Sequence, residues 1–151
     1  MKMNNRYISR GKRKDIGEWV YGFYVFQRKR SGKFGQVISE LDSNRHFIID
    51  AQGKSNEVIP ETVGQCTGRK YANDKLLFEG DIVEWYSDYD DTWGYSHTAE
   101  YCGVIVWNTN DYCWNIKVNN ELIPFNDYDW DISMMVIGNI YDNPELLEVE
   151  R

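Results

Sequence analysis

The segment of residues 61–85 constrains the fold of this 151-residue chain more than any other. It opens with short, turn-rich pieces and ends in Glu79-Gly80-Asp81, which the alternating, strand-like residues 82–85 follow directly. Glycine tolerates the positive φ that a tight corner requires, so the sequence predicts a sharp turn at Gly80 that leads into a β-strand. We therefore assign a structural role to Gly80 and Asp81.

Short β-rich segments recur along the whole chain, with turn residues between them. Aromatic residues make up 15% of the sequence, and they favour strands and contact surfaces. Residues 10–14 are predicted as a basic turn, residues 87–97 as an acidic loop, and Gly22 as a bulge or bend. Strands are predicted at residues 6–9, 17–26, 36–41, 45–50, 98–107, 112–118 and 134–141. This spacing favours a mainly β fold, either a small barrel or a sandwich.

The chain changes character at Pro60. Pro60 suits the first position of a short helical turn, as does Pro144 near the end of the chain, where Asn143 is the expected cap. We place a boundary here and expect two β subdomains, residues 1–60 and residues 61–151.

Charge is distributed unevenly between the two halves. Residues 1–75 carry 15 Lys and Arg against 8 Asp and Glu, whereas residues 76–151 carry 2 against 16, which together give the net charge of −7. Such a difference indicates a basic nucleic-acid face, head-to-tail association of opposite charges, or solvated surfaces without a partner.

Several classes of protein are disfavoured. The polar, basic residues 1–13 are not followed by an apolar run, and no stretch approaches the roughly 20 apolar residues of a membrane-spanning helix, so we expect a cytoplasmic protein without a membrane partner. The three cysteines form no CxxC pair. The acidic clusters at residues 88–99 and 127–138 lack the glycine and the final glutamate of a calcium loop. We expect no metal and no cofactor.

No catalytic motif is present around His46 or His97, which are the only histidines, so we expect no enzymatic activity. Two kinds of binding surface remain. Basic segments flank the aromatic residues 19–24, and cations beside aromatic rings suit single-stranded nucleic acid. The candidate nucleic-acid contacts are Arg10, Lys12, Arg13, Lys14, Arg28, Lys29 and Arg30. Apolar side chains on both faces of this segment favour a buried or interface strand instead.

The second half combines acidic charge with exposed rings, which suits protein binding because aromatic residues bury much area at low entropic cost. The candidate protein-contact aromatics of the chain are Trp19, Tyr21, Trp93, Tyr95 and Trp130. Part of this aromatic set is equally suited to filling a barrel core.

Four blocks of sequence, in order, carry a resemblance to a known family. They are Glu18-Trp19-Val20-Tyr21-Gly22, then Pro60-Glu61-Thr62-Val63-Gly64-Gln65 with Thr67-Gly68, then Glu79-Gly80-Asp81-Ile82-Val83, and finally Val136-Ile137-Gly138-Asn139-Ile140-Tyr141 with Asn143-Pro144-Glu145-Leu146-Leu147. The chain resembles the YopX family of phage and prophage proteins. The resemblance implies an N-terminal all-β part that associates with other copies and a C-terminal SH3-like barrel, with no catalytic residues to transfer.

We give Gly64, Gly138 and Pro144 of these blocks structural roles. The expected function is that of a non-enzymatic protein that forms homo-oligomers and contacts a protein partner. Nucleic-acid binding through the basic N-terminal segments is the alternative.

Overall fold

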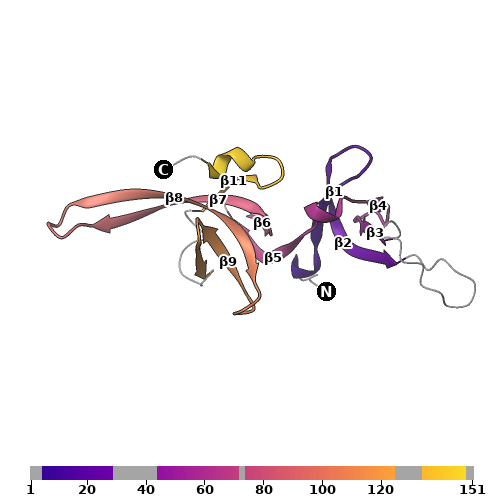
Figure 1. Ribbon diagram of the computed structural model, residues 1–151, viewed down its shortest axis with the longest axis horizontal. Coiled ribbons are helices and arrows are strands. Elements are labelled where there is room, and N and C mark those ends of the chain that lie inside the picture. The colour runs from indigo at the N-terminus through magenta and orange to yellow at the C-terminus, as the bar shows by residue number, and fades with distance from the viewer. Residues whose placement is uncertain (1–4, 29–43, 72–73, 125–133, 149–151) are drawn as a thin grey trace, which may run out of the picture. The chain divides into compact units, whose positions relative to one another are not determined.

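The computed structural model describes residues 5–28, 44–71, 74–124 and 134–148 (Figure 1). The prediction of a mainly β chain is confirmed, because the described strands form two antiparallel sheets. Neither sheet closes on itself among the described strands. In the part of the chain that the structure describes, no helix is long and apolar enough to span a membrane.

The first sheet has six strands in the order β4-β3-β2-β1-β5-β6. Their bounds are β1 (Ser9–Lys12), β2 (Trp19–Arg28), β3 (Asn44–Ile49), β4 (Ser55–Glu57), β5 (Gly64–Tyr71) and β6 (Lys75–Phe78). The second sheet has five strands in the order β10-β9-β8-β7-β11. Their bounds are β7 (Asp81–Asp90), β8 (Ser96–Asn108), β9 (Cys113–Val118), β10 (Glu121–Pro124) and β11 (Met135–Asn139).

The chain divides into two compact units, which we call the N-terminal unit (residues 6–65) and the C-terminal unit (residues 66–151 with residues 1–5). Three short 3-10 helices complete the described secondary structure: η1 (Asn5–Tyr7), η4 (Pro60–Thr62) and η6 (Pro144–Leu147). The helical turns predicted at Pro60 and Pro144 are thus present. The separate roles predicted for the two halves stay predictions.

The N-terminal unit differs from expectation at its start. Residues 6–9 were predicted as a strand and 10–14 as a turn, but the strand β1 begins at Ser9 and runs through Gly11 to Lys12. Gly11 serves packing, since a Cβ there would lie 3.2 Å from atoms of Ile48 and Val58. These two residues and Val20 form the buried core of the unit. The turn falls later, where Gly17 has φ +72°.

Gly22 divides β2 into two parts with different partners. Residues 19–22 pair with β1, whereas residues 23–28 pair with β3. A Cβ on Gly22 would lie 1.9 Å from the carbonyl oxygen of Ile49, so β3 approaches the backbone of β2 more closely than any side chain allows. The close approach explains why a glycine interrupts an otherwise apolar strand.

The C-terminal unit has its core between β6, β7, β8 and β9. The buried residues of this core are Leu77, Val83, Trp85, Ile105, Ile116 and Met134. Gly80, with φ +80°, makes the corner between β6 and β7, and its N–H donates to the carbonyl of Ile105 at 2.9 Å. The buried Asp81 accepts a hydrogen bond from the backbone N–H of Phe78 at 2.8 Å, which closes the corner.

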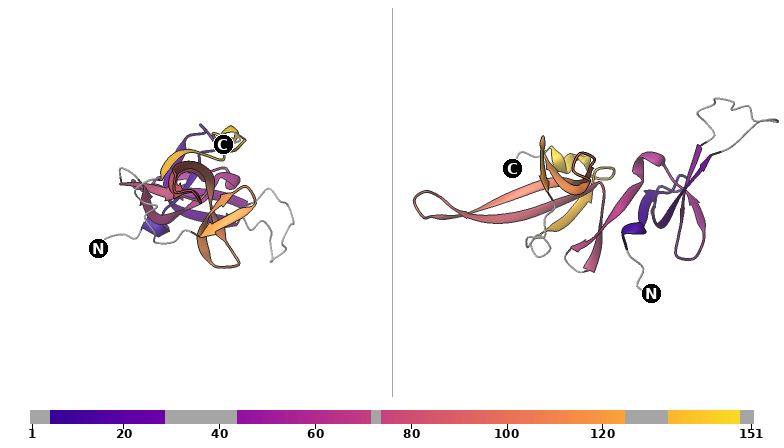
Figure 2. Two further views of the ribbon diagram at one scale, coloured as in Figure 1. Left: turned by 90° about the vertical axis from the view of Figure 1, so that its left-hand side faces the viewer. Right: turned by 90° about the horizontal axis from the view of Figure 1, so that it is seen from below.

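The predicted loop at residues 87–97 is wrong. β7 and β8 continue as a hairpin to the pair Asp90 and Ser96, and a turn at residues 91–95 joins them. The prediction failed because an alternation of polar and aromatic residues, without a buried face, reads as a loop. Residues 85–101 pair only with one another among the described strands, and we call this segment the arm. It extends from the rest of its unit as a two-stranded ribbon (Figures 1 and 2).

Other local predictions agree or differ in detail. The antiparallel pair predicted at residues 98–107 and 112–118 is confirmed as β8 with β9. The turn-rich start expected for residues 61–85 is largely the strand β5. Gly138 lies at an irregularity in the pairing of β11 with β7, and a Cβ there would lie 2.6 Å from Oδ1 of Asn143. The strand predicted at residues 36–41 lies outside the described residues.

Candidate protein-contact surfaces

The outer part of β2 exposes apolar side chains on both of its faces. Tyr21, Phe23, Val25 and Phe26 are between 39% and 49% exposed, and Tyr24 is 39% exposed. Successive side chains of a strand point to opposite faces, so Phe23 and Val25 lie on one face and Tyr24 and Phe26 on the other. Val20, which precedes these residues in β2, belongs to the buried core of the unit. We call residues 21–26 the β2 aromatic surface.

His46 on β3 contributes to one face of this surface. It lies opposite Phe26 in the sheet, and the two rings meet edge to face with centroids 5.2 Å apart. The Tyr24 hydroxyl lies 2.6 Å from Nδ1 of His46 and donates to that nitrogen when it carries no proton. Partial burial raises the pKa of Tyr24, which therefore stays protonated near neutral pH. Nothing in the sequence placed these rings together, because 20 residues separate them.

Trp19 contacts cations of the same unit. The Arg10 guanidinium lies 4.7 Å and the Lys12 ammonium 5.6 Å from the Trp19 ring centroid. The ring is half-buried, and Arg10 is only 6% exposed, which leaves little of its side chain for a phosphate. These cations thus stabilise the ring within the unit through cation–π contact. Lys12 keeps partial exposure, and its assignment to nucleic acid stays a prediction.

Carboxylates lie beside three further basic residues that the structure describes in the N-terminal unit. Arg13 makes a two-pronged contact with Asp15, at 2.6 and 3.0 Å. Glu57 pairs with both Lys14, at 3.5 Å, and Arg45. The Arg45 contact is the main cause that lowers the pKa of Glu57, so this carboxylate stays charged to a lower pH than an unpaired glutamate. We call Arg13, Lys14, Arg45 and Lys54 the basic edge.

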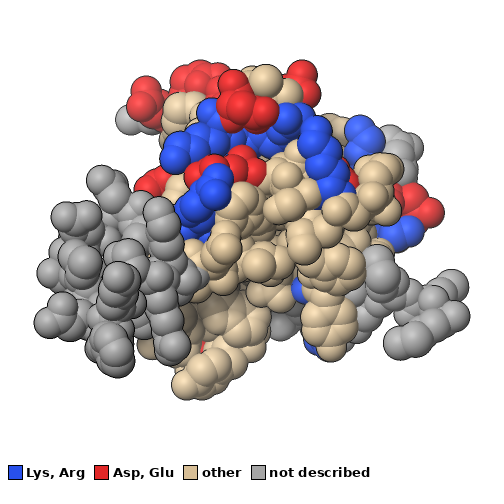
Figure 3. All heavy atoms as spheres, turned by 90° about the vertical axis from the view of Figure 1, so that its right-hand side faces the viewer, with Lys and Arg blue, Asp and Glu red and all other residues tan. Residues whose placement is uncertain are grey.

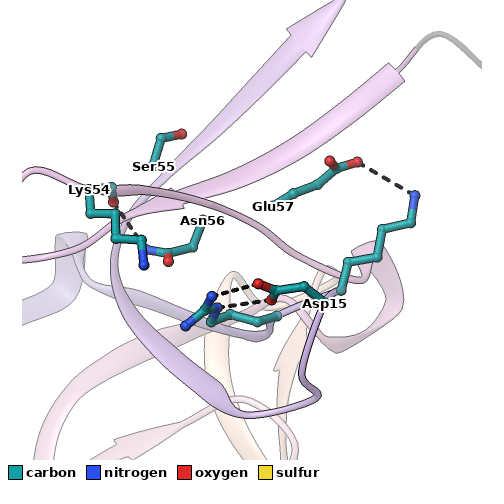
Figure 4. A pocket seen from close by; sticks show the side chains of 7 residues that line it. Asp15, Lys54, Ser55, Asn56 and Glu57 are labelled. Carbon is teal, nitrogen blue, oxygen red and sulfur yellow. Dashed lines mark hydrogen bonds and ion pairs between the residues drawn. The ribbon is translucent and has the colours of Figure 1, made fainter.

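A shallow polar groove of about 460 Å³ lies along this edge, lined by Arg13, Lys14, Asp15 and residues 54–57. In Figure 4 the dashed lines at Asp15 and at Glu57 mark their ion pairs with Arg13 and Lys14. Asn56, which is buried, donates to Asp50 and to two backbone carbonyls. The ion pairs with Arg13 and Arg45 are the main causes that lower the pKa values of Asp15 and Glu57, respectively, so the groove carries charges of both signs.

Basic and uncharged side chains adjoin on one face of the molecule. Figure 3 shows Lys and Arg side chains in a band, with Asp and Glu among them, beside a broad area of uncharged residues. Several residues that the sequence predicted as contacts cannot be placed. Lys29, Arg30 and Trp130 lie outside the described residues, and of Arg28 only the backbone, at the end of β2, is described.

The tip of the arm presents two of the predicted protein-contact aromatics. Trp93 is 84% and Tyr95 is 70% exposed. The carboxylate of Asp91 holds the turn by accepting backbone N–H groups of Trp93 and Tyr95, at 2.8 and 2.9 Å, and it lies 3.0 Å from Nε2 of His97. The Tyr95 hydrogen bond is the largest cause that lowers the pKa of Asp91.

Metal-ligating and nucleophilic side chains do not converge on a common point in the part of the chain that is described. No group of three or more His, Cys, Asp or Glu within these residues is arranged to hold a metal ion. Cys66 is buried, Cys102 and Cys113 are half-buried, and none of the three forms a disulfide bond.

Comparison with protein families decides the relationship that the four sequence blocks suggested. The family described as YopX protein matches residues 10–148. The chain belongs to the YopX family. The comparison with curated proteins returned no match.

For this YopX protein, the match includes both units and all five residues given structural roles. Gly64 is buried in β5 and pairs with Arg10 of β1, and Pro144 is the first residue of η6. Asn143 precedes it as the cap, although its side chain makes no capping hydrogen bond.

Proposed function

We propose that this YopX protein is a non-enzymatic, phage- or prophage-encoded protein that self-associates and acts through protein–protein contacts in the cytoplasm of the host cell. In this proposal the N-terminal unit provides the contacts between copies, and the C-terminal unit has the architecture of an SH3-like barrel. The observation that carries the proposal is the β2 aromatic surface.

An apolar strand that stays exposed on both faces is costly in water. The side chains of Phe23 and Phe26 remain 45% and 49% exposed, although they lie on opposite faces of the same strand. Burial of apolar area yields about 25 cal/mol per Å², and aromatic residues are enriched where protein surfaces meet. Contact with a second copy would bury the rings on one of these faces, and a further contact those on the other.

The chemistry of the described ionisable groups supports a binding role. Every described carboxyl group with a resolved shift, namely Asp15, Asp50, Glu57 and Asp91, has its pKa lowered. A general acid at neutral pH requires the opposite shift, produced by burial or a neighbouring like charge.

The proposal is tested with a double substitution, Phe23→Thr with Phe26→Thr. Threonine keeps the strand propensity of these positions while it removes one ring from each face. Ile16→Thr is the matched control, because Ile16 is 53% exposed in the same unit and lies outside β2. Size-exclusion chromatography with light scattering should show a smaller assembly for the double variant and an unchanged one for the control. Assemblies of equal mass in all three proteins would overturn the role of β2.

A further inference from the structure

The arm has two faces of different chemistry. Tyr86, Asp88 and Asp90 alternate along β7 and share one face, and Glu100 lies directly opposite Tyr86 on that same face. The other face holds Trp85, which stacks on Tyr101 with ring centroids 5.4 Å apart. Tyr86 is 46% exposed, so the acidic face also carries a ring that is open to a partner.

The residues across the sheet from the aspartates are hydroxyls. Asp88 accepts a hydrogen bond from Thr98 and Asp90 from Ser96, each at 2.6 Å. An opposite charge on the neighbouring strand stabilises an aspartate in a sheet, but residues 76–116, which include both strands of the arm, contain no Lys or Arg. The hydroxyls fix the carboxylates in place without neutralising them, so the negative charge of this face is available to a partner.

The partner that fits this face is positively charged, and this chain supplies such a surface itself. On the basic edge, four cations (Arg13, Lys14, Arg45 and Lys54) lie near three carboxylates (Asp15, Asp50 and Glu57). Arg13, Lys14 and Lys54, with Asp15 and Glu57, line an open groove. Over the full sequence, residues 1–75 carry a charge of +7 and residues 76–151 a charge of −14. Opposite fields of this kind orient two copies head to tail and speed their encounter.

We propose that the acidic face of the arm binds the basic edge of the N-terminal unit of a second copy, with Trp93 at the tip as its apolar anchor. The proposal deepens the self-association proposed above by adding a second contact, of a different physical kind. Such a contact joins unlike surfaces, so it either repeats around a ring or along a chain of copies, or occurs twice, reciprocally, within a two-fold pair.

The two contacts differ in their response to salt. Charges on exposed side chains are screened beyond about 8 Å at physiological ionic strength, whereas apolar burial is not weakened by simple salts at that concentration. Raising the salt concentration should therefore release the arm contact and leave the β2 contact intact.

The direct test is zero-length carbodiimide crosslinking of an equal mixture of ¹⁴N- and ¹⁵N-labelled full-length protein. This reagent joins a carboxylate to a lysine amine only where the two touch. The expected result is a mixed-isotope crosslink from Asp88 or Asp90 to Lys14 or Lys54, lost at high salt. Mixed-isotope crosslinks that join the arm to other lysines, or none from the arm at low salt, would overturn the proposal.

Charge substitutions provide a quantitative second test. Asp88→Asn with Asp90→Asn keeps an acceptor for both hydroxyls and removes two charges. Its control, Glu121→Gln with Glu145→Gln, removes two exposed charges elsewhere in the C-terminal unit. The first variant should weaken low-salt association roughly three- to tenfold, as the loss of two exposed ion pairs implies, and the control should not. Equal weakening in both would reduce the effect to net charge and overturn a contact at the arm.

The tip is tested separately with Trp93→Ser against Tyr112→Asn, which removes a ring that is 79% exposed at another turn of the unit. Only Trp93→Ser should lower the yield of the mixed-isotope crosslink. If the crosslink fails while wild-type protein still assembles through β2, the arm contact is wrong and the proposed function stands. If β2 substitutions leave the assembly unchanged while the crosslink forms, the arm contact stands and the role of β2 in the proposed function is wrong.

Discussion

Gly22→Ala should destabilise the N-terminal unit far more than an ordinary glycine-to-alanine change in a strand. Alanine normally strengthens a strand by up to about 1 kcal/mol, because it restricts the unfolded chain. At Gly22, however, the added Cβ would lie 1.9 Å from the carbonyl oxygen and 2.7 Å from the carbonyl carbon of Ile49. Both atoms belong to the backbone of β3, so no change of rotamer relieves the contact.

The magnitude follows from how far β3 must retreat. Real Cβ atoms essentially never approach within 3.0 Å of another heavy atom, so the backbone at Ile49 has to shift by about 1 Å. That shift breaks the pairing of Phe23 with Ile49 and moves Ile48 in the core. Overpacking costs about 1–3 kcal/mol where side chains absorb it, and we expect about 3 kcal/mol or more where the backbone must move.

Amide hydrogen exchange followed by mass spectrometry measures this effect in the N-terminal unit alone, even when the two units unfold separately. Gly11→Ala is the matched control, because its Cβ would meet only side chains, at 3.2 Å, and should cost about 1 kcal/mol or less. Protection of the β2 and β3 amides should be highest in wild type, lower in Gly11→Ala and lowest in Gly22→Ala. Protection of Gly22→Ala equal to that of wild type would refute the close approach of β3 to β2.

Three further predictions concern other parts of the chain. Asp81→Ala should lower the free energy of unfolding of the C-terminal unit by about 1–3 kcal/mol, measured by urea titration, because it leaves the buried N–H of Phe78 without the acceptor at 2.8 Å; an unchanged midpoint would contradict that role. The pKa of Asp91 is lowered from 3.8, so its stabilising effect on the arm tip is present above that pH and is lost as the pH falls through the folded-state pKa. Trp93 fluorescence should show this acid transition in wild type but not in Asp91→Asn. The same transition in both proteins would assign it to another group. Labelled single-stranded DNA should show no saturable binding by anisotropy at near-physiological salt, because DNA binding requires several phosphates to be neutralised and the basic edge holds three of its cations beside carboxylates. Salt-sensitive binding that is lost on neutralising Arg28, Lys29 and Arg30 would favour the nucleic-acid alternative.

Local chemistry made several features of the fold predictable. Gly80 before a run of β-branched residues predicted the corner into β7, and proline at positions 60 and 144 predicted the two short helices. These features depend on a few neighbouring residues. Features that depend on distant neighbours were missed. Gly11 looked like a turn glycine, because the sequence does not show that Ile48 and Val58 pack against its backbone.

The arm was missed for a different physical reason. Strand prediction relies on one buried face, and among the described side chains of residues 85–101 only Trp85 is buried. Their polar and aromatic residues alternate without an apolar stripe, so the pattern is that of a loop. The aromatic side chains themselves, Trp93 and Tyr95, were recognised from composition. Their placement at the tip of a long hairpin required the pairing of β7 with β8.

On the surfaces too, the kinds of side chain could be predicted from composition, whereas the contacts between them could not. The sequence predicted a buried or interface strand from the apolar residues of β2; the structure exposes both faces of its outer part, and the interface role stays a prediction. The sequence did not predict that Glu57 lies between Lys14 and Arg45, or that Arg10 is buried over Trp19. Such contacts join strands that are far apart along the chain.

The central claim is that copies of this chain associate through the β2 aromatic surface, and sedimentation equilibrium of the wild-type protein tests it most directly. The account predicts a mass above the 17.9 kDa of one chain, rising with concentration, that persists when high salt has removed the charge contacts. A mass of 17.9 kDa at every concentration and salt would contradict the claim.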